Sequence, residues 1–160
     1  MLHLIQVNAH ILMQLIIFCG VQASGKSTFY QQYFSHSHLR LNLDMLKTRH
    51  RENLLFEAAL ASKTKLVIDN TNPTIEARSR YIARAKAAGF EIVAYYFATD
   101  LNSTLQRNGQ RTGKANIPEV GVRTTYKKLE MPQLSEGFHE IYQISIIPNN
   151  EFSIQLLDTV

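Results

Sequence analysis

Residues 20–28 read Gly-Val-Gln-Ala-Ser-Gly-Lys-Ser-Thr and match the pattern G-x-x-x-x-G-K-[ST], whose residue types suit phosphate binding. Glycines let backbone N–H groups converge on an anion, and the following helix N-terminus adds a favourable dipole. The pattern predicts that Lys26 bridges the β- and γ-phosphates of ATP and that the Ser27 hydroxyl ligates Mg²⁺. A glycine-rich turn that only joins a strand to a helix is the alternative. The residues that we expect to contact the nucleotide are Gly20, Val21, Gln22, Ala23, Ser24, Gly25, Lys26, Ser27 and Thr28.

Two aspartates each follow an expected strand and could complete the chemistry. Asp69 closes the run Leu66-Val67-Ile68, where its carboxylate could join Ser27 in the Mg²⁺ site; turn formation or helix capping is the alternative. Asp44 follows the short run 40–43, and a carboxylate there could act as the general base for an attacking hydroxyl. Asp44 could equally cap the helix that follows it.

Basic residues near these positions could bind anions. Lys47, Arg49 and Arg51 follow Asp44 within two helical turns and lie either near an anionic acceptor or on a solvated face. Arg107 and Arg111 belong to a glycine-containing segment, 107–114, that we interpret as a mobile lid. An arginine brought over the γ-phosphate neutralises charge in the transition state, so we assign Arg111 to catalysis and Arg107 to nucleotide binding. The six histidines show no metal-ligand spacing, and we expect no structural metal.

The order of apolar and helix-like stretches indicates how these residues are positioned. Strands that alternate with helices are typical of βαβ units and a parallel sheet. A helix is expected over about 45–62, and another begins near Asn72, which could cap it, and ends before Gly89. We predict a three-layer α/β fold of the P-loop, nucleotide-kinase-like type, with a mostly parallel sheet of about five strands and a C-terminal hairpin. The expected strands are 15–19, 40–43, 65–69, 91–98, 138–147 and 151–157.

Length and composition fit one globular domain. The 160 residues are 45% hydrophobic and 19% charged, which excludes a collagen-like or disordered chain. We interpret residues 1–12 as an N-terminal extension and 13–160 as the kinase domain. Polar residues interrupt the apolar N-terminus, and no signal peptide or membrane span fits it. The single cysteine, Cys19, permits no internal disulfide, so a cytoplasmic location is expected.

Several segments together resemble the kinase module of the polynucleotide 5′-hydroxyl kinases found in polynucleotide kinase-phosphatases. The resemblance extends from about Leu15 to Ile147, and the stretches Asp-Asn-Thr-Asn-Pro (69–73) and Leu-Ser-Glu-Gly-Phe (134–138) are its most specific parts. The other matching segments are Gly20–Thr28, Asn42-Leu43-Asp44, Ala77–Tyr81, the Arg111 lid and the segment that starts at Ile117-Pro118.

The resemblance implies an ATP- and Mg²⁺-dependent transfer of phosphate to the 5′-hydroxyl of a nucleic acid end. It assigns Asp44 as the general base, Lys26 and Ser27 to the phosphate cradle, and Arg111 as the lid arginine. Where the phage-type enzyme has an arginine that grips the acceptor phosphate, this chain has Lys47, to which we assign acceptor binding. The family commonly has arginine before the catalytic aspartate, where this chain has Leu43. The Asp-x-Asp-Gly-Thr phosphatase signature is absent from the 160 residues.

Two other functions fit the same sequence. A P-loop scaffold can carry a small-molecule kinase for a nucleoside, sugar or antibiotic, or a non-catalytic ATP-binding switch or adaptor. A basic groove at Asp44 would favour the nucleic acid kinase, a closed pocket would favour the small-molecule kinase, and Asp44 placed away from the phosphate cradle would favour the switch.

Overall fold

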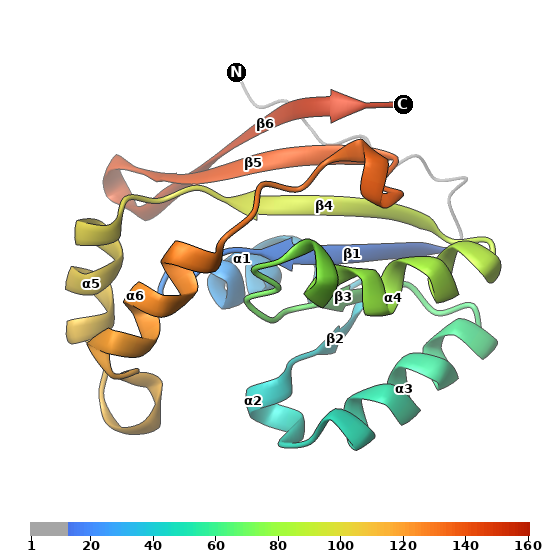
Figure 1. Cartoon of the computed structure of the whole chain (residues 1–160), viewed down its shortest axis with the longest axis horizontal. Coiled ribbons are helices and arrows are strands. Elements are labelled where there is room, and N and C mark those ends of the chain that lie inside the picture. Colours follow the sequence, from blue (N-terminus) through green and yellow to red (C-terminus); the bar gives the residue numbers. More distant parts are fainter. Residues whose placement is uncertain (1–12) are drawn as a thin grey trace.

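A computed structural model describes residues 13–160, in which six strands form one sheet (Figure 1). The strand order is β2-β3-β1-β4-β5-β6; the first five strands are parallel, and β6 is antiparallel to β5. The parallel sheet and the C-terminal hairpin confirm the predicted architecture. The proposed extension, 1–12, lies outside the described residues. The strands are β1 (Gln14–Cys19), β2 (Leu39–Leu41), β3 (Leu66–Ile68), β4 (Glu91–Phe97), β5 (Glu140–Ile147) and β6 (Glu151–Thr159).

Helices connect the parallel strands and cover both faces of the sheet (Figure 1). None of the helices within residues 13–160 is long and apolar enough to cross a bilayer. The α-helices are α1 (Lys26–Tyr33), α2 (Leu43–Leu46), α3 (Arg49–Ala61), α4 (Ile75–Ala87), α5 (Leu101–Gly109) and α6 (Glu119–Lys128). Three short 3-10 helices are η1 (Gly113–Ala115), η2 (Leu134–Glu136) and η3 (Pro148–Asn150).

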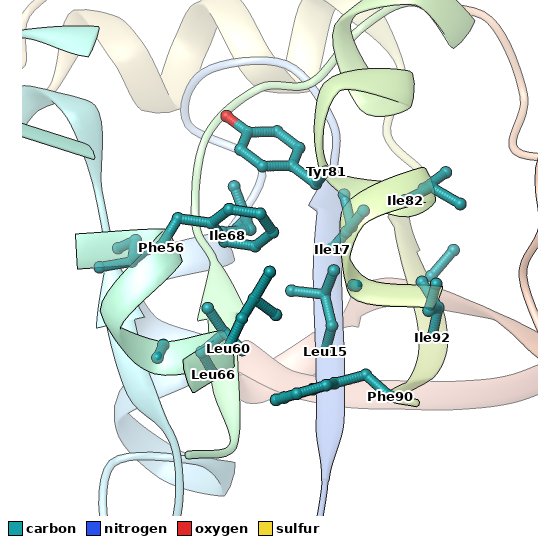
Figure 2. Packing of buried hydrophobic residues seen from close by; sticks show 14 of the residues in the cluster. Leu15, Ile17, Phe56, Leu60, Leu66, Ile68, Tyr81, Ile82, Phe90 and Ile92 are labelled. Carbon is teal, nitrogen blue, oxygen red and sulfur yellow. The ribbon is translucent and has the colours of Figure 1, made fainter. Parts of the chain in front are cut away.

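Two apolar clusters hold the layers together because alternate residues of each buried strand face opposite sides of the sheet. On one face, Leu15 and Ile17 of β1 pack with Phe56 of α3 and Tyr81 of α4 (Figure 2). On the other face, Phe18 packs edge-on against Phe29 of α1, with ring centroids 5.9 Å apart. The sheet is therefore the middle of three layers, and the carboxyl ends of its parallel strands meet at the edge beside α2 and α5 (Figure 1).

The bounds of one helix and the cap of another differ from the sequence-based predictions. The helix expected over 45–62 is split into α2 and α3, because Lys47 adopts a left-handed φ of 75° and Thr48 caps α3 by accepting from the Arg51 N–H. The cap of α4 is Thr74, which accepts from the Ala77 N–H, and not Asn72. Asn72 instead has φ 41° and donates from Nδ2 to the Phe18 carbonyl. Gly89 follows α4 with φ 83°, as expected.

Candidate active site

The loop between β1 and α1 wraps back on itself at the end of the central strand. Gly25 has φ 96°, a backbone conformation that residues other than glycine rarely adopt. A Cβ atom at this position would also lie 2.9 Å from the Phe152 ring. The Lys26 ammonium donates to the carbonyls of Gly20 (2.9 Å) and Val21 (2.6 Å), so the side chain curls over the loop. Burial lowers the pKa of Lys26 to about 8, against the opposing effect of Asp69. An anionic ligand would relieve this burial cost.

One cavity of about 580 Å³ brings most of the predicted site residues together. Five of the nine loop residues line it, whereas Gly20, Val21, Gly25 and Thr28 do not. Its charged lining consists of five basic side chains against two carboxylates. The predicted site residues in the lining are Gln22, Ala23, Ser24, Lys26, Ser27, Asp44, Asp69 and Arg111, and its further charged residues are Arg40, Arg49 and Lys114.

Ser27 and Asp69 form an oxygen-rich corner of this cavity. The Ser27 hydroxyl lies 3.4 Å from Asp69 Oδ2, and the Asp69 side chain is 1% exposed. A hydroxyl and a carboxylate are ligands that Mg²⁺ accepts, usually with water and substrate phosphates in addition, so these residues fit that ion. Within residues 13–160 no group of three or more His, Cys, Asp or Glu side chains is arranged to hold a metal.

Arg40 contacts both members of this corner. Its Nη2 lies 2.7 Å from Asp69 Oδ2 and donates to Ser27 Oγ at 3.0 Å, and its Nε donates to Asp69 Oδ2 at 2.8 Å. The guanidinium thus neutralises the buried Asp69 carboxylate. We did not predict this role from the sequence, because Arg40 lies in a short edge strand and its acidic partner is supplied by the neighbouring strand β3.

Asp44 lies in the first turn of α2 with its side chain exposed to the cavity. The N-cap of α2 is Asn42, whose side chain accepts from the Met45 N–H. The N-cap of α3 is Thr48. The suggestion that Asp44 caps the following helix is therefore wrong, and its carboxylate remains available to a ligand.

The residues of the expected lid divide into two groups. Arg107 lies in the last turn of α5, donates to the Ala23 carbonyl (2.6 Å) and Thr99 Oγ1 (2.7 Å), and so supports the phosphate loop from outside the cavity. Arg111 and Lys114 follow α5 in an exposed segment and both line the cavity. Arg111 is close enough to Lys26 to lower its pKa, although less than burial does.

The three basic residues after Asp44 differ in whether they line the cavity. Arg49, at the start of α3, lines the cavity with Asp44. Lys47, to which we assigned acceptor binding, does not line it, and Arg51 donates to the Leu46 carbonyl at 3.3 Å. Sequence spacing could not distinguish among the three, because the break between α2 and α3 determines which of their side chains face the cavity.

Arg78 on α4 holds the loop between β3 and α4 beside the phosphate loop. Its side chain is fully buried and pairs with Glu136 through Nε (2.8 Å) and Nη2 (3.0 Å). Its Nη1 donates to the Asn72 carbonyl at 3.1 Å and to Cys19 Sγ at 3.3 Å. The two most specific segments of the sequence, 69–73 and 134–138, are therefore joined through one arginine.

Comparisons of sequence identify the family and its relatives. The family model described as an AAA domain, AAA_33, matches residues 15–131. A bifunctional polynucleotide phosphatase/kinase of Schizosaccharomyces pombe is 29% identical over 137 residues, covering 82% of this chain and 33% of that protein. An L-seryl-tRNA(Sec) kinase of Methanococcus maripaludis is 30% identical over 138 residues, covering 74% of this chain and 53% of that protein. The chain thus spans a third to a half of the length of these relatives.

Comparisons of structure confirm the P-loop kinase fold. Kti12 of Chaetomium thermophilum in complex with ADP-AlF3 superposes with a TM-score of 0.66 at 14% identity, covering 82% of this chain and 88% of that chain. A gluconokinase from Sinorhizobium meliloti superposes with a TM-score of 0.58 at 16% identity, covering 84% and 83%. At these identities the likeness concerns the fold alone.

Proposed function

Because this chain belongs to the AAA domain family and forms a P-loop kinase domain, we propose that it transfers the γ-phosphate of ATP to the 5′-hydroxyl of a nucleic acid. The observation that carries the proposal is the single cavity in which Asp44 and Lys26 both take part. Its excess of basic over acidic side chains suits two polyanionic substrates, ATP and a nucleic acid strand. The polynucleotide phosphatase/kinase among the relatives supports the same acceptor.

The residues of the cavity divide the reaction between them. Lys26 and the backbone of the phosphate loop bind the β- and γ-phosphates. Ser27 and Asp69 are the residues that would hold Mg²⁺, which, when bound, supplies charge neutralisation at the phosphate oxygens. Asp44 orients the acceptor 5′-hydroxyl and takes its proton as the new O–P bond forms and ADP leaves. Arg111 neutralises the charge that develops on the transferred group.

A small-molecule kinase is the second candidate. The L-seryl-tRNA(Sec) kinase relative shows that related chains differ in their acceptor, but its acceptor is carried on a tRNA and does not itself favour a small molecule. The non-catalytic switch is disfavoured, because Asp44 lines the same cavity as Lys26.

A transfer assay tests the proposal directly. The protein is incubated with γ-labelled ATP and Mg²⁺, and with 5′-hydroxyl oligonucleotides of DNA or RNA, nucleosides, or gluconate as acceptors. We expect label at the oligonucleotide 5′-end and none when the 5′-end already carries phosphate. Lys26→Ala is the control for contaminating kinases and should abolish transfer. Efficient labelling of a nucleoside or gluconate, with oligonucleotides inactive, would instead establish the small-molecule kinase.

A further inference from the structure

A second, smaller cavity adjoins the first at Arg49. It lies between α3 and α4 and has a volume of about 220 Å³. Of the residues that the structure describes, only Arg49 lines both cavities. The smaller cavity is basic, with Arg49, Arg80 and Arg84 against one carboxylate, Glu52. A path lined by cations therefore leads from Asp44 into the crevice between the two helices.

Arg49 is held in place by a buried network. Its Nη1 donates to Glu52 Oε1 and to the Tyr81 hydroxyl, both at 2.9 Å. Glu52 is 3% exposed and also accepts from Tyr81 (2.8 Å) and from Asn70 Nδ2 (2.9 Å). Figure 2 shows the Tyr81 hydroxyl directed away from the apolar cluster beneath its ring. Because Asn70 follows Asp69, the network ties Arg49 to the end of β3, which carries the candidate metal ligand.

The same network leaves most donors of Arg49 available. Its side chain is 49% exposed, and Nη2 and Nε make no hydrogen bond to any part of residues 13–160. A guanidinium fixed through one nitrogen presents its other donors at little entropic cost, an arrangement suited to phosphate. Arg49, rather than Lys47, is therefore the basic residue placed to contact a ligand here, because Lys47 lines neither cavity.

The other two arginines of the crevice differ in their surroundings. Arg80 is exposed, and its side chain makes no hydrogen bond or ion pair within the described part of the chain. Arg84 is already engaged, since it pairs with Glu57, donates to Asn53 Oδ1 at 2.6 Å and lies 4.6 Å over the Phe56 ring. Arg80 is therefore able to bind a ligand, and Arg84 stabilises the wall of the crevice.

Resting on the proposed function, we infer that Arg49 and Arg80 form a phosphate subsite for the acceptor strand. With the 5′-hydroxyl at Asp44, Arg49 binds the first phosphate on the 3′ side of that nucleotide. The strand then enters the crevice between α3 and α4, where Arg80 binds a later phosphate. The subsite selects acceptors that carry phosphate beyond the reacting nucleoside.

Steady-state kinetics with acceptors of graded length test this subsite. The acceptors are a nucleoside, a nucleoside 3′-monophosphate, a dinucleotide 3′-phosphate and a decamer, each with a free 5′-hydroxyl. We expect Arg49→Gln to raise the KM of every phosphate-bearing acceptor about tenfold or more, with the KM of ATP changed by less than about twofold. Arg80→Gln should raise the KM progressively as the acceptor lengthens. Arg51→Gln is the matched control, because it removes the same charge from an exposed arginine of α3 that lines neither cavity.

Binding measurements separate the subsite from the reaction. Anisotropy of a labelled decamer, measured over a range of salt concentrations, should show that Arg49→Gln and Arg80→Gln each lower the salt slope by about 0.7. An Arg49→Gln effect of equal size on the bare nucleoside would make Arg49 a structural residue and overturn the subsite. Unchanged decamer binding and KM in both variants would overturn it while leaving the proposed function intact. If the parent protein neither binds nor phosphorylates oligonucleotides, both proposals fall.

Discussion

Asp44 combines three properties that a general base needs: a carboxylate, exposure to the cavity, and freedom from a structural hydrogen bond at the helix start. Asn42 and Thr48 provide the helix caps on either side of it. A change at Asp44 can therefore report on chemistry rather than on folding.

We predict that Asp44→Asn lowers kcat by about 10²–10⁴, because asparagine keeps the shape of the side chain but cannot accept the proton. ATP affinity should change by less than about threefold and the melting temperature should stay the same, since the residue acts mainly in the transition state. Single-turnover transfer, ATP titration and thermal unfolding measure the three quantities. Turnover near that of the parent would remove Asp44 from the mechanism, and loss of ATP binding would place it in the metal site.

Arg40 gives a second prediction at the scale of one residue. Its guanidinium lies on Asp69 and Ser27, the two residues proposed for Mg²⁺, so cation and arginine compete for the same carboxylate. Arg40→Gln should therefore tighten Mn²⁺ binding several-fold, measured by electron paramagnetic resonance without nucleotide. Arg51→Gln, which removes an exposed arginine outside the cavity, is the control. An unchanged or weaker Mn²⁺ affinity in Arg40→Gln would contradict the competition.

At the scale of elements, the sequence predicted strands better than helix faces. The run 15–19 was recognisable because both faces of a central parallel strand are buried and the residues are continuously apolar. The helix after Asp44 was harder, because helix-forming residues surround Lys47 and nothing local indicated its left-handed φ of 75°. In α3 the apolar residues Leu54 and Leu55 are exposed, whereas Phe56 and Glu52 are buried, so apolar character alone does not identify the inner face. Because the turn at Lys47 separates α3 from α2, the residues of α3 that face the sheet are not those expected for one continuous helix.

The site was predictable to the extent that local motifs define it. The phosphate loop, Asp69 and Asp44 follow strands whose carboxyl ends meet at one edge, and the sequence order was enough to bring them together. Arg40 and Arg49 were assigned no definite role, because their functions depend on Asp69 and Glu52, partners that only the folded chain supplies.

His38 links the end of α1 to the edge strand β2 and gives a prediction about pH. Its ring contacts Gln14 Oε1 (2.9 Å) and Ser37 Oγ (2.7 Å), and it is 5% exposed. Burial, with a smaller contribution from Lys65, lowers the pKa of His38 to about 4. Between that value and the usual pKa of about 6.5, the unfolded chain binds more protons than the folded one. Stability should therefore fall as the pH falls through this window.

We expect this histidine to account for about 1–3 kcal/mol of the stability lost between pH 7 and pH 4.5. Urea unfolding at both pH values should show a smaller loss for His38→Gln than for the parent protein. His36→Gln removes an exposed histidine two residues away and should behave as the parent does. An equal loss in the parent and in His38→Gln would show that His38 is protonated in the folded state.

At the scale of the whole molecule, Arg78 joins segments that are far apart in the sequence. It lies on α4 and contacts Cys19 at the end of β1, the Asn72 and Glu130 carbonyls, and Glu136 in η2. The Glu136 side chain is 4% exposed, so this ion pair is almost free of solvent. Because Cys19 precedes the phosphate loop and Asn72 belongs to the loop after β3, Arg78 sets the relative position of two walls of the cavity.

The last prediction follows from the burial of that pair. Removing one member of a buried ion pair leaves an unpaired charge, so Arg78→Met should lower the free energy of unfolding by about 3–5 kcal/mol. Arg78→Met combined with Glu136→Leu should recover part of the loss, because it replaces both charges with apolar groups. Arg123→Met removes the partner of Glu119 in an exposed pair on α6 and should cost less than about 1 kcal/mol. Urea denaturation of the four proteins gives these values; a loss in Arg78→Met no larger than that in Arg123→Met would mean that apolar packing alone holds the two walls together.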